Sequence, residues 1–181
     1  MKKLFAFIVS ILALAACGPF QPEFANYRPV QQGDPLPEFR VTDLEGFNWT
    51  STYLSHLGKV VAIVFYNTEC PDCRAEMPVL KAVHEALEDK PVQFIGIGRE
   101  SGNAETMSMV QEFGIRFPMC PQDDRKVFEL FAPSRVPRVY ITDTMGIVRY
   151  IHTDEPLATE EELVQEITDL LPKEDQVLIC N

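Results

Sequence analysis

The sequence predicts an α/β domain in which a central mixed sheet carries helices on both faces. The first observation is a run of seven apolar residues at 60–66, a pattern typical of a strand buried on both faces. The second is a helical stripe of apolar residues directly after it, within residues 70–88. The third is the order of the remaining segments, which alternate strand and helix before a final hairpin and helix.

The first half of the domain begins with a strand at residues 39–43, where apolar and polar side chains alternate before a turn at Gly46. Thr50 or Ser51 caps a short helical turn that ends before Gly58. The buried strand at 60–66 follows. The helix at 70–88 then begins with Pro71, whose missing N–H is tolerated at the first helical position.

The second half contains two more helices and three strands before its last helix. These are a strand at 92–97, a helix at 104–113 ended by Gly114, a helix ending near Phe131, and a hairpin of strands 139–142 and 147–151 around Asp143-Thr144-Met145-Gly146. Thr159 caps a last helix that runs to Leu171, and Pro172 stops it.

The N-terminus has the layout of an export signal. Two lysines precede an apolar stretch at 4–14, which is shorter than the roughly 20 residues of a membrane-spanning helix. Leu14-Ala15-Ala16-Cys17 also resembles the lipobox of bacterial lipoproteins, in which the cysteine is lipidated and becomes the first residue of the mature chain. We therefore expect a signal peptide at 1–16 and lipid attachment at Cys17. The alternative is an ordinary secretory signal cut near Ala16.

Composition divides the rest of the chain into three parts. Residues 18–37 contain five prolines and little apolar periodicity, so we expect a linker from the lipid anchor at 17–35. The folded domain is expected at 36–172, followed by a C-terminal tail at 173–181.

Charge and compartment limit the partners. Removing residues 1–16 takes away two lysines and no acidic residue, so the formal charge changes from −11 to −13. This balance argues against binding to nucleic acid or to anionic lipid, both of which need clustered basic side chains. Export places the chain outside the cytosol, where disulfides persist.

Two cysteines, Cys70 and Cys73, lie where the buried strand hands over to its helix. This junction is at the carboxyl edge of the sheet, where open α/β sheets place their sites. A helix N-terminus stabilises negative charge, and Cys-x-x-Cys pairs there often have a first thiol of lowered pKa. An accessible thiolate with a second thiol in reach is suited to disulfide exchange. Cys70 is expected to attack a disulfide and Cys73 to resolve the intermediate.

Other uses of the pair fit the sequence less well. A zinc site needs further Cys or His at short spacing, but the three histidines are isolated and Cys120 and Cys180 stand alone, so no metal is expected. A structural disulfide across two residues would close too short a loop to stabilise the fold. Cys120 is best explained as a small buried hydrophobic residue. The sequence leaves open whether Cys180 pairs with it.

Three segments together resemble the thioredoxin-like superfamily: VVAIVFYNTECPDCRAEMPVL, Val136-Pro137 before a strand, and the Asp-x-x-Gly hairpin. Within it, residues 36–172 are similar to the membrane-anchored thiol–disulfide oxidoreductases of the TlpA/ResA type. The resemblance implies a thioredoxin-like fold with an inserted helix and strand, supplied by residues 104–120. It also implies a redox disulfide between Cys70 and Cys73, no bound cofactor, and protein disulfides as substrates.

The resemblance assigns roles to two further residues. Pro137 matches a cis-proline that lies beside the disulfide and helps to position a substrate chain. Glu76 matches a glutamate of ResA-type members that assists thiol proton transfer, although a solvated helix residue would look the same in the sequence.

The chain also departs from its relatives. Glu69 stands where most have Trp, Val64 where cytosolic thioredoxins bury an Asp, and Arg138 where many have a smaller polar residue. The missing Asp leaves Glu76 as the nearest candidate base.

A peroxiredoxin-like thiol peroxidase is the main alternative. Those enzymes carry Pro-x-x-x-Thr/Ser-x-x-Cys, but the matching positions before Cys70 are Ile63 and Asn67, and those before Cys73 are Tyr66 and Cys70. A metal-binding thioredoxin-like chaperone fits less well still.

The sequence therefore predicts a thiol–disulfide oxidoreductase of the bacterial cell envelope, lipid-anchored and facing the periplasm. The carboxylates of Glu69 and Asp72 beside Cys70 disfavour its thiolate, so we expect a reductase. Such a reductase needs a membrane electron donor with its own thiols. The client proteins and the choice of membrane stay open.

Overall fold

The computed structural model describes residues 28–172 of the chain. Its elements, in chain order, are β1 (Arg40–Thr42), β2 (Asn48–Thr50), α1 (Ser51–His56), β3 (Val60–Tyr66), α2 (Pro71–Ala86), β4 (Val92–Gly98), α3 (Asn103–Phe113), β5 (Met119–Cys120), α4 (Lys126–Phe131), β6 (Arg138–Thr142), β7 (Val148–His152) and α5 (Glu160–Leu170). The expected signal peptide, Cys17, the tail and Cys180 lie outside the described residues. No helix within 28–172 is long and apolar enough to cross a membrane.

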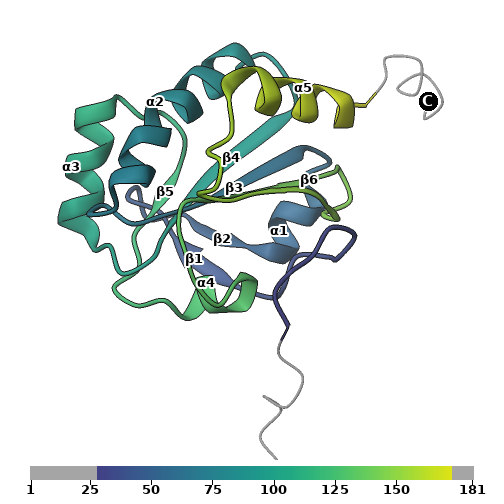
Figure 1. Cartoon of the computed structure of the whole chain (residues 1–181). Helices are drawn as coiled ribbons and strands as arrows, with labels where there is room; N and C mark the ends of the chain where they lie inside the picture. Colours follow the sequence, from purple (N-terminus) through teal and green to yellow (C-terminus); the bar gives the residue numbers. More distant parts are fainter. Residues whose placement is uncertain (1–27, 173–181) are drawn as a thin grey trace, which may run out of the picture.

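Five strands form the central sheet in the order β5-β4-β3-β6-β7. β3 is parallel to β4 and antiparallel to β6, so the sheet is mixed. Figure 1 shows α2 and α5 on one side of this sheet and α1 and α4 on the other, with α3 at one end. The predicted fold class is thus confirmed, including the inserted helix and strand, which are α3 and β5.

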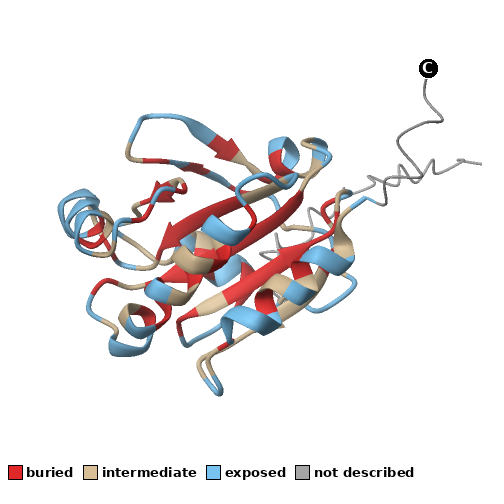
Figure 2. Ribbon diagram, turned by 90° about the horizontal axis from the view of Figure 1, so that it is seen from above, coloured by how far each residue is buried: buried red, intermediate tan, exposed pale blue. Residues whose placement is uncertain are grey.

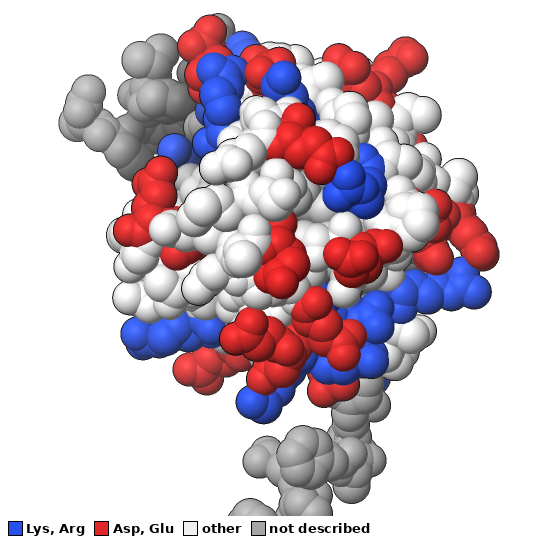
Figure 3. Space-filling model, turned by 90° about the vertical axis from the view of Figure 1, so that its left-hand side faces the viewer, with Lys and Arg blue, Asp and Glu red and all other residues white. Residues whose placement is uncertain are grey.

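The sheet is buried because helices cover both of its faces. Every residue of β3 is fully buried, which explains why this strand has a continuous apolar sequence instead of an alternating one. Figure 2 shows the central strands in red, whereas the outer faces of the helices are largely exposed. Most charged residues of the helices lie on those outer faces, with Glu76 of α2 as a buried exception. Figure 3 shows acidic side chains across the middle of the side on which α3 lies.

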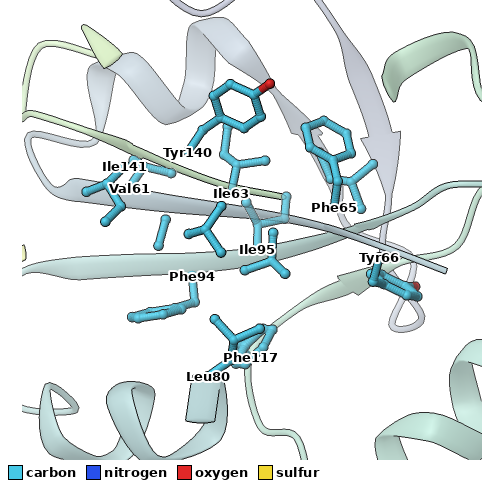
Figure 4. Close-up of a cluster of buried hydrophobic side chains, with 14 of the residues drawn as sticks. Val61, Ile63, Phe65, Tyr66, Leu80, Phe94, Ile95, Phe117, Tyr140 and Ile141 are labelled. Atoms are coloured by element: carbon cyan, nitrogen blue, oxygen red, sulfur yellow. The ribbon is translucent and has the colours of Figure 1, made fainter. Parts of the chain in front are cut away.

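Aromatic and aliphatic side chains fill the space on each side of the sheet. Phe65 of β3 contacts the ring of Tyr140, with ring centroids 6.0 Å apart, and the ring of Phe131 of α4 at 4.8 Å. In Figure 4, Phe94 of β4 and Leu80 of α2 lie on the opposite side of the strands from Phe65. The two packed layers fix the position of β3, and with it the start of α2.

The structure differs from the sequence-based prediction in two places. β2 was not predicted, and it pairs antiparallel with β1 in a separate two-stranded sheet. Part of the expected linker also contacts the folded domain. The Val30 N–H donates to the Phe131 carbonyl at 2.9 Å and Pro35 forms a bridge with Ile147, so the end of the expected linker lies against the domain.

Candidate active site

The cysteine pair lies at the start of α2, directly after β3 and a turn of residues 67–69. Cys70 is the N-cap residue, with an extended backbone, and Pro71 occupies the first helical turn as expected. Cys73 lies in that same turn. Both cysteines are free thiols, so the structure describes the pair in its dithiol form.

The two thiols have different environments. Cys70 is half-buried, and its S–H donates to the Val136 carbonyl at 3.5 Å. Cys73 is fully buried, and its Sγ accepts the Asn67 N–H at 3.4 Å. Burial raises the pKa of Cys73 and its neighbours Cys70 and Glu76 raise it further, whereas the Asn67 N–H acts to lower it. The outer thiol can be reached by another molecule, and the inner thiol can react only with the outer one.

The loop before β6 contacts the outer thiol through the Val136 carbonyl. The peptide bond between Val136 and Pro137 is cis, as the motif predicted. β6 pairs with β3, the strand that leads to the cysteines, so this loop lies beside Cys70. The structure brings Pro137 and Cys70 together through the Val136 carbonyl.

Glu76 is buried, with 1% of its surface exposed, and is not the solvated residue that its sequence position allowed. Its Oε2 atom has no hydrogen-bond partner within residues 28–172. Burial raises the pKa of this carboxyl to about 7. Since Glu76 also acts electrostatically on Cys73, the site contains a carboxyl group that can hold or release a proton near neutral pH beside the inner thiol.

The turn between β3 and α2 contains functional candidates that the sequence did not identify. The Asn67 side-chain amide donates to the Arg99 carbonyl at 2.8 Å, and the Thr68 N–H donates to Ser101 Oγ at 3.0 Å. The only sequence signal for a role of Asn67 is that asparagine is a common turn residue. The carbonyl that its Nδ2 contacts is more than 30 positions away in the chain, so local sequence could not reveal this anchor.

The charge beside Cys70 is negative. Glu69 and Asp72 flank it and both are exposed, while the nearby Arg74 forms an ion pair with Glu112 of α3. Among the described residues, no group of three His, Cys, Asp or Glu side chains is placed to hold a metal ion.

Known proteins are similar to this chain in sequence and in fold. The model of the AhpC/TSA family matches residues 32–151. The chain is 29% identical over 153 residues to thiol-disulfide oxidoreductase ResA of Bacillus thuringiensis strain Al Hakam, covering 82% of this chain and 87% of that one. It is 28% identical over 174 residues to the ResA of a Bacillus cereus strain, covering 93% and 99%.

Solved structures agree with the sequence relatives. A candidate protein disulfide isomerase from Bacteroides thetaiotaomicron has a TM-score of 0.71 at 26% identity, covering 81% of this chain and 93% of that one. A thioredoxin-family thiol:disulfide interchange protein from Chlorobium tepidum has a TM-score of 0.66 at 21% identity, covering 82% and 100%. Because the family model spans more than half of the sequence, the chain belongs to the AhpC/TSA family, and it has the thioredoxin-like fold of its thiol–disulfide oxidoreductase relatives.

Proposed function

We propose that this protein is a thiol–disulfide oxidoreductase that reduces disulfides of client proteins outside the cytoplasm. The observation that carries the proposal is the asymmetry of the cysteine pair. A half-buried Cys70 caps α2, a fully buried Cys73 lies behind it, and a buried carboxyl of raised pKa follows one turn later. Relatives named for the same activity support it.

The proposed reaction has two steps. The Cys70 thiolate attacks one sulfur of the client disulfide, and the other client sulfur leaves as a thiolate and takes up a proton. Glu76 then accepts the proton of Cys73, whose thiolate attacks Cys70 Sγ and displaces the second client sulfur, which is also protonated. The client gains two electrons and two protons, and the pair becomes a Cys70–Cys73 disulfide.

Pro137 is proposed to position the client. The adjacent Val136 carbonyl reaches Cys70, so a chain lying along this loop has its sulfur next to the nucleophile. An extended client segment can use exposed backbone groups for such docking.

We further propose that the pair works as a reductant. The carboxylates of Glu69 and Asp72 are exposed beside Cys70, and we expect their negative charge to keep the reduction potential of the pair low. Strong oxidants of this chemistry instead have a stabilised reduced form. We expect a potential nearer to about −270 mV than to about −120 mV, and a value above about −180 mV would exclude a reductase. A membrane protein with its own thiols would then restore the dithiol.

The location is proposed from the N-terminal sequence. A lipid on Cys17 would hold the domain at a membrane of the cell envelope, facing the periplasm. Metabolic labelling with a fatty-acid probe should mark the mature protein. An unlabelled protein that begins at a residue other than Cys17 would refute the anchor.

Trapping of clients tests the reaction directly. Cys73→Ser should accumulate mixed disulfides with clients because the second step is blocked, whereas Cys70→Ser should accumulate none. The opposite result would reverse the assignment of the nucleophile. A peroxide assay tests the alternative enzyme class. The wild-type protein should consume hydrogen peroxide slowly. Fast consumption that survives Cys73→Ser but not Cys70→Ser would indicate a peroxidase instead.

A further inference from the structure

Asn67 forms hydrogen bonds through three of its polar groups within the turn and the first turn of α2. Its backbone N–H donates to Cys73 Sγ at 3.4 Å, and its backbone carbonyl accepts the Cys70 N–H at 3.2 Å. Its side-chain Oδ1 accepts the Glu69 N–H at 2.8 Å, which closes the turn. One residue therefore contacts both cysteines and the residue before them.

The side-chain amide of Asn67 anchors this turn to the loop after β4. Nδ2 donates to the Arg99 carbonyl at 2.8 Å and to the Glu100 carbonyl at 3.4 Å. Glu100 has a φ of 55°, a left-handed conformation that is uncommon for a residue other than glycine. Glu100 is itself held, because its N–H donates to the Asp124 carbonyl at 3.0 Å. The loop thus presents two fixed carbonyls to Asn67.

The N–H that these contacts orient points at the inner thiol. Cys73 is fully buried and cannot be solvated by water when it loses its proton. Burial and the neighbouring groups disfavour its thiolate, and the Asn67 N–H is the hydrogen bond that opposes them. A backbone donor of fixed direction is effective in such a site because it needs no reorganisation during the reaction.

We propose that Asn67 is a positioning residue for the second step of the reaction, because its side chain holds its own backbone N–H against the sulfur of Cys73. The inference rests on the proposed function. In that step Cys73 gives its proton to Glu76, and its thiolate attacks Cys70 Sγ while the client thiolate leaves. Asn67 contributes by stabilising the Cys73 thiolate, and it has no part in the first attack by Cys70.

A chromogenic disulfide separates the two steps. When the dithiol protein reacts with dithiobis(nitrobenzoate), attack by Cys70 releases one coloured thiolate and resolution by Cys73 releases the second. Asn67→Ala should slow the second release about tenfold, the effect of losing one hydrogen bond to a charged group. The first release should change less than about twofold. The midpoint of the pH profile of the second release, which the Glu76 carboxyl sets, should stay near 7, whereas a general disturbance of the buried site would move it.

Asn67→Ser separates the two side-chain contacts of Asn67, the one with the Glu69 N–H and the one with the carbonyls of the loop after β4. The serine hydroxyl can still accept the Glu69 N–H, but it has no amide to reach the carbonyls of the β4 loop. We expect the same slow second release as for Asn67→Ala. A wild-type rate in Asn67→Ser would overturn the proposal. Asn103→Ala, which removes an exposed asparagine at the start of α3, is the matched control and should behave like wild type.

Hydrogen exchange at the Asn67 amide tests the contact with Cys73 without any Asn67 variant, so it can be used even if both variants fail to fold. In the native dithiol protein the Asn67 amide should exchange slowly, and in Cys73→Ala it should exchange at least about tenfold faster. Equal rates would overturn the proposal. If the wild-type protein releases only one coloured thiolate, the proposed function itself fails. If it releases two and the Asn67 variants match it, only this inference fails.

Discussion

Cys73 and Cys120 are two fully buried free thiols of the same domain, and burial raises the pKa of each. Cys120 lies in β5, pairs through its backbone with Ile97 of β4, and belongs to the hydrophobic core. Cys73 has a second thiol, the Asn67 N–H and the Glu76 carboxyl beside it. Burial alone makes a thiol unreactive, and the neighbouring groups make Cys73 usable.

The largest expected difference between these thiols is in activity. Cys70→Ser or Cys73→Ser should lower the rate of insulin reduction at least about a thousandfold, because each removes a reacting sulfur. Cys120→Ala should stay within about twofold of wild type, since it removes only a packed side chain. A folded Cys120→Ala protein without activity would show that the third thiol takes part in the reaction.

The second prediction concerns the pH dependence of stability, which buried Glu76 should cause and buried Cys120 should not. The folded pKa of about 7 lies above the ordinary value of 4.5, so the folded protein holds this proton more tightly than the unfolded chain. The free energy of unfolding should therefore fall by about 3 kcal/mol as the pH rises from about 4.5 to about 7, and stay level above that. Urea unfolding at several pH values measures it. Glu76→Gln should lose this slope and Cys120→Ala should keep it.

Glu76 should also make the rate at which Cys73 resolves the mixed disulfide depend on pH, whereas Cys120 has no such neighbouring base in this reaction. Release of the second thiolate in the chromogenic assay should rise with pH through about 7, because only the ionised carboxyl accepts the Cys73 proton. Glu76→Gln should slow this release about a hundredfold at neutral pH. An unchanged rate would mean that water, and not Glu76, takes the proton.

The smallest expected effect concerns the outer thiol. Asp72→His replaces an exposed carboxylate beside Cys70 with a group that favours its thiolate, so it should stabilise the reduced form. The potential should rise by about 30 mV, measured by equilibration against a dithiol buffer. Asp169→His on α5 is the control. If Asp72→His leaves the potential where it was, these carboxylates do not set it.

Most of the fold could be predicted because its signals are local. The apolar run of β3, the stripe of α2, Gly114 at the end of α3 and Thr159 before α5 each act within a few residues. β2 escaped prediction because three residues, Asn48–Thr50, carry no periodicity, and their pairing with β1 holds them in a strand.

The sequence by itself determined the chemistry of the site: two thiols with two residues between them at the start of a helix, and a carboxyl three positions after the second thiol. Tertiary structure alone decided which thiol is more accessible, that Glu76 is buried without a partner for Oε2 among the described residues, and that the Asn67 N–H contacts Cys73. These properties depend on contacts from the loop after β4, through Arg99 and Glu100, and from the loop before β6, through Val136. Burial and hydrogen-bond direction arise from contacts distant in sequence, so no local pattern encodes them.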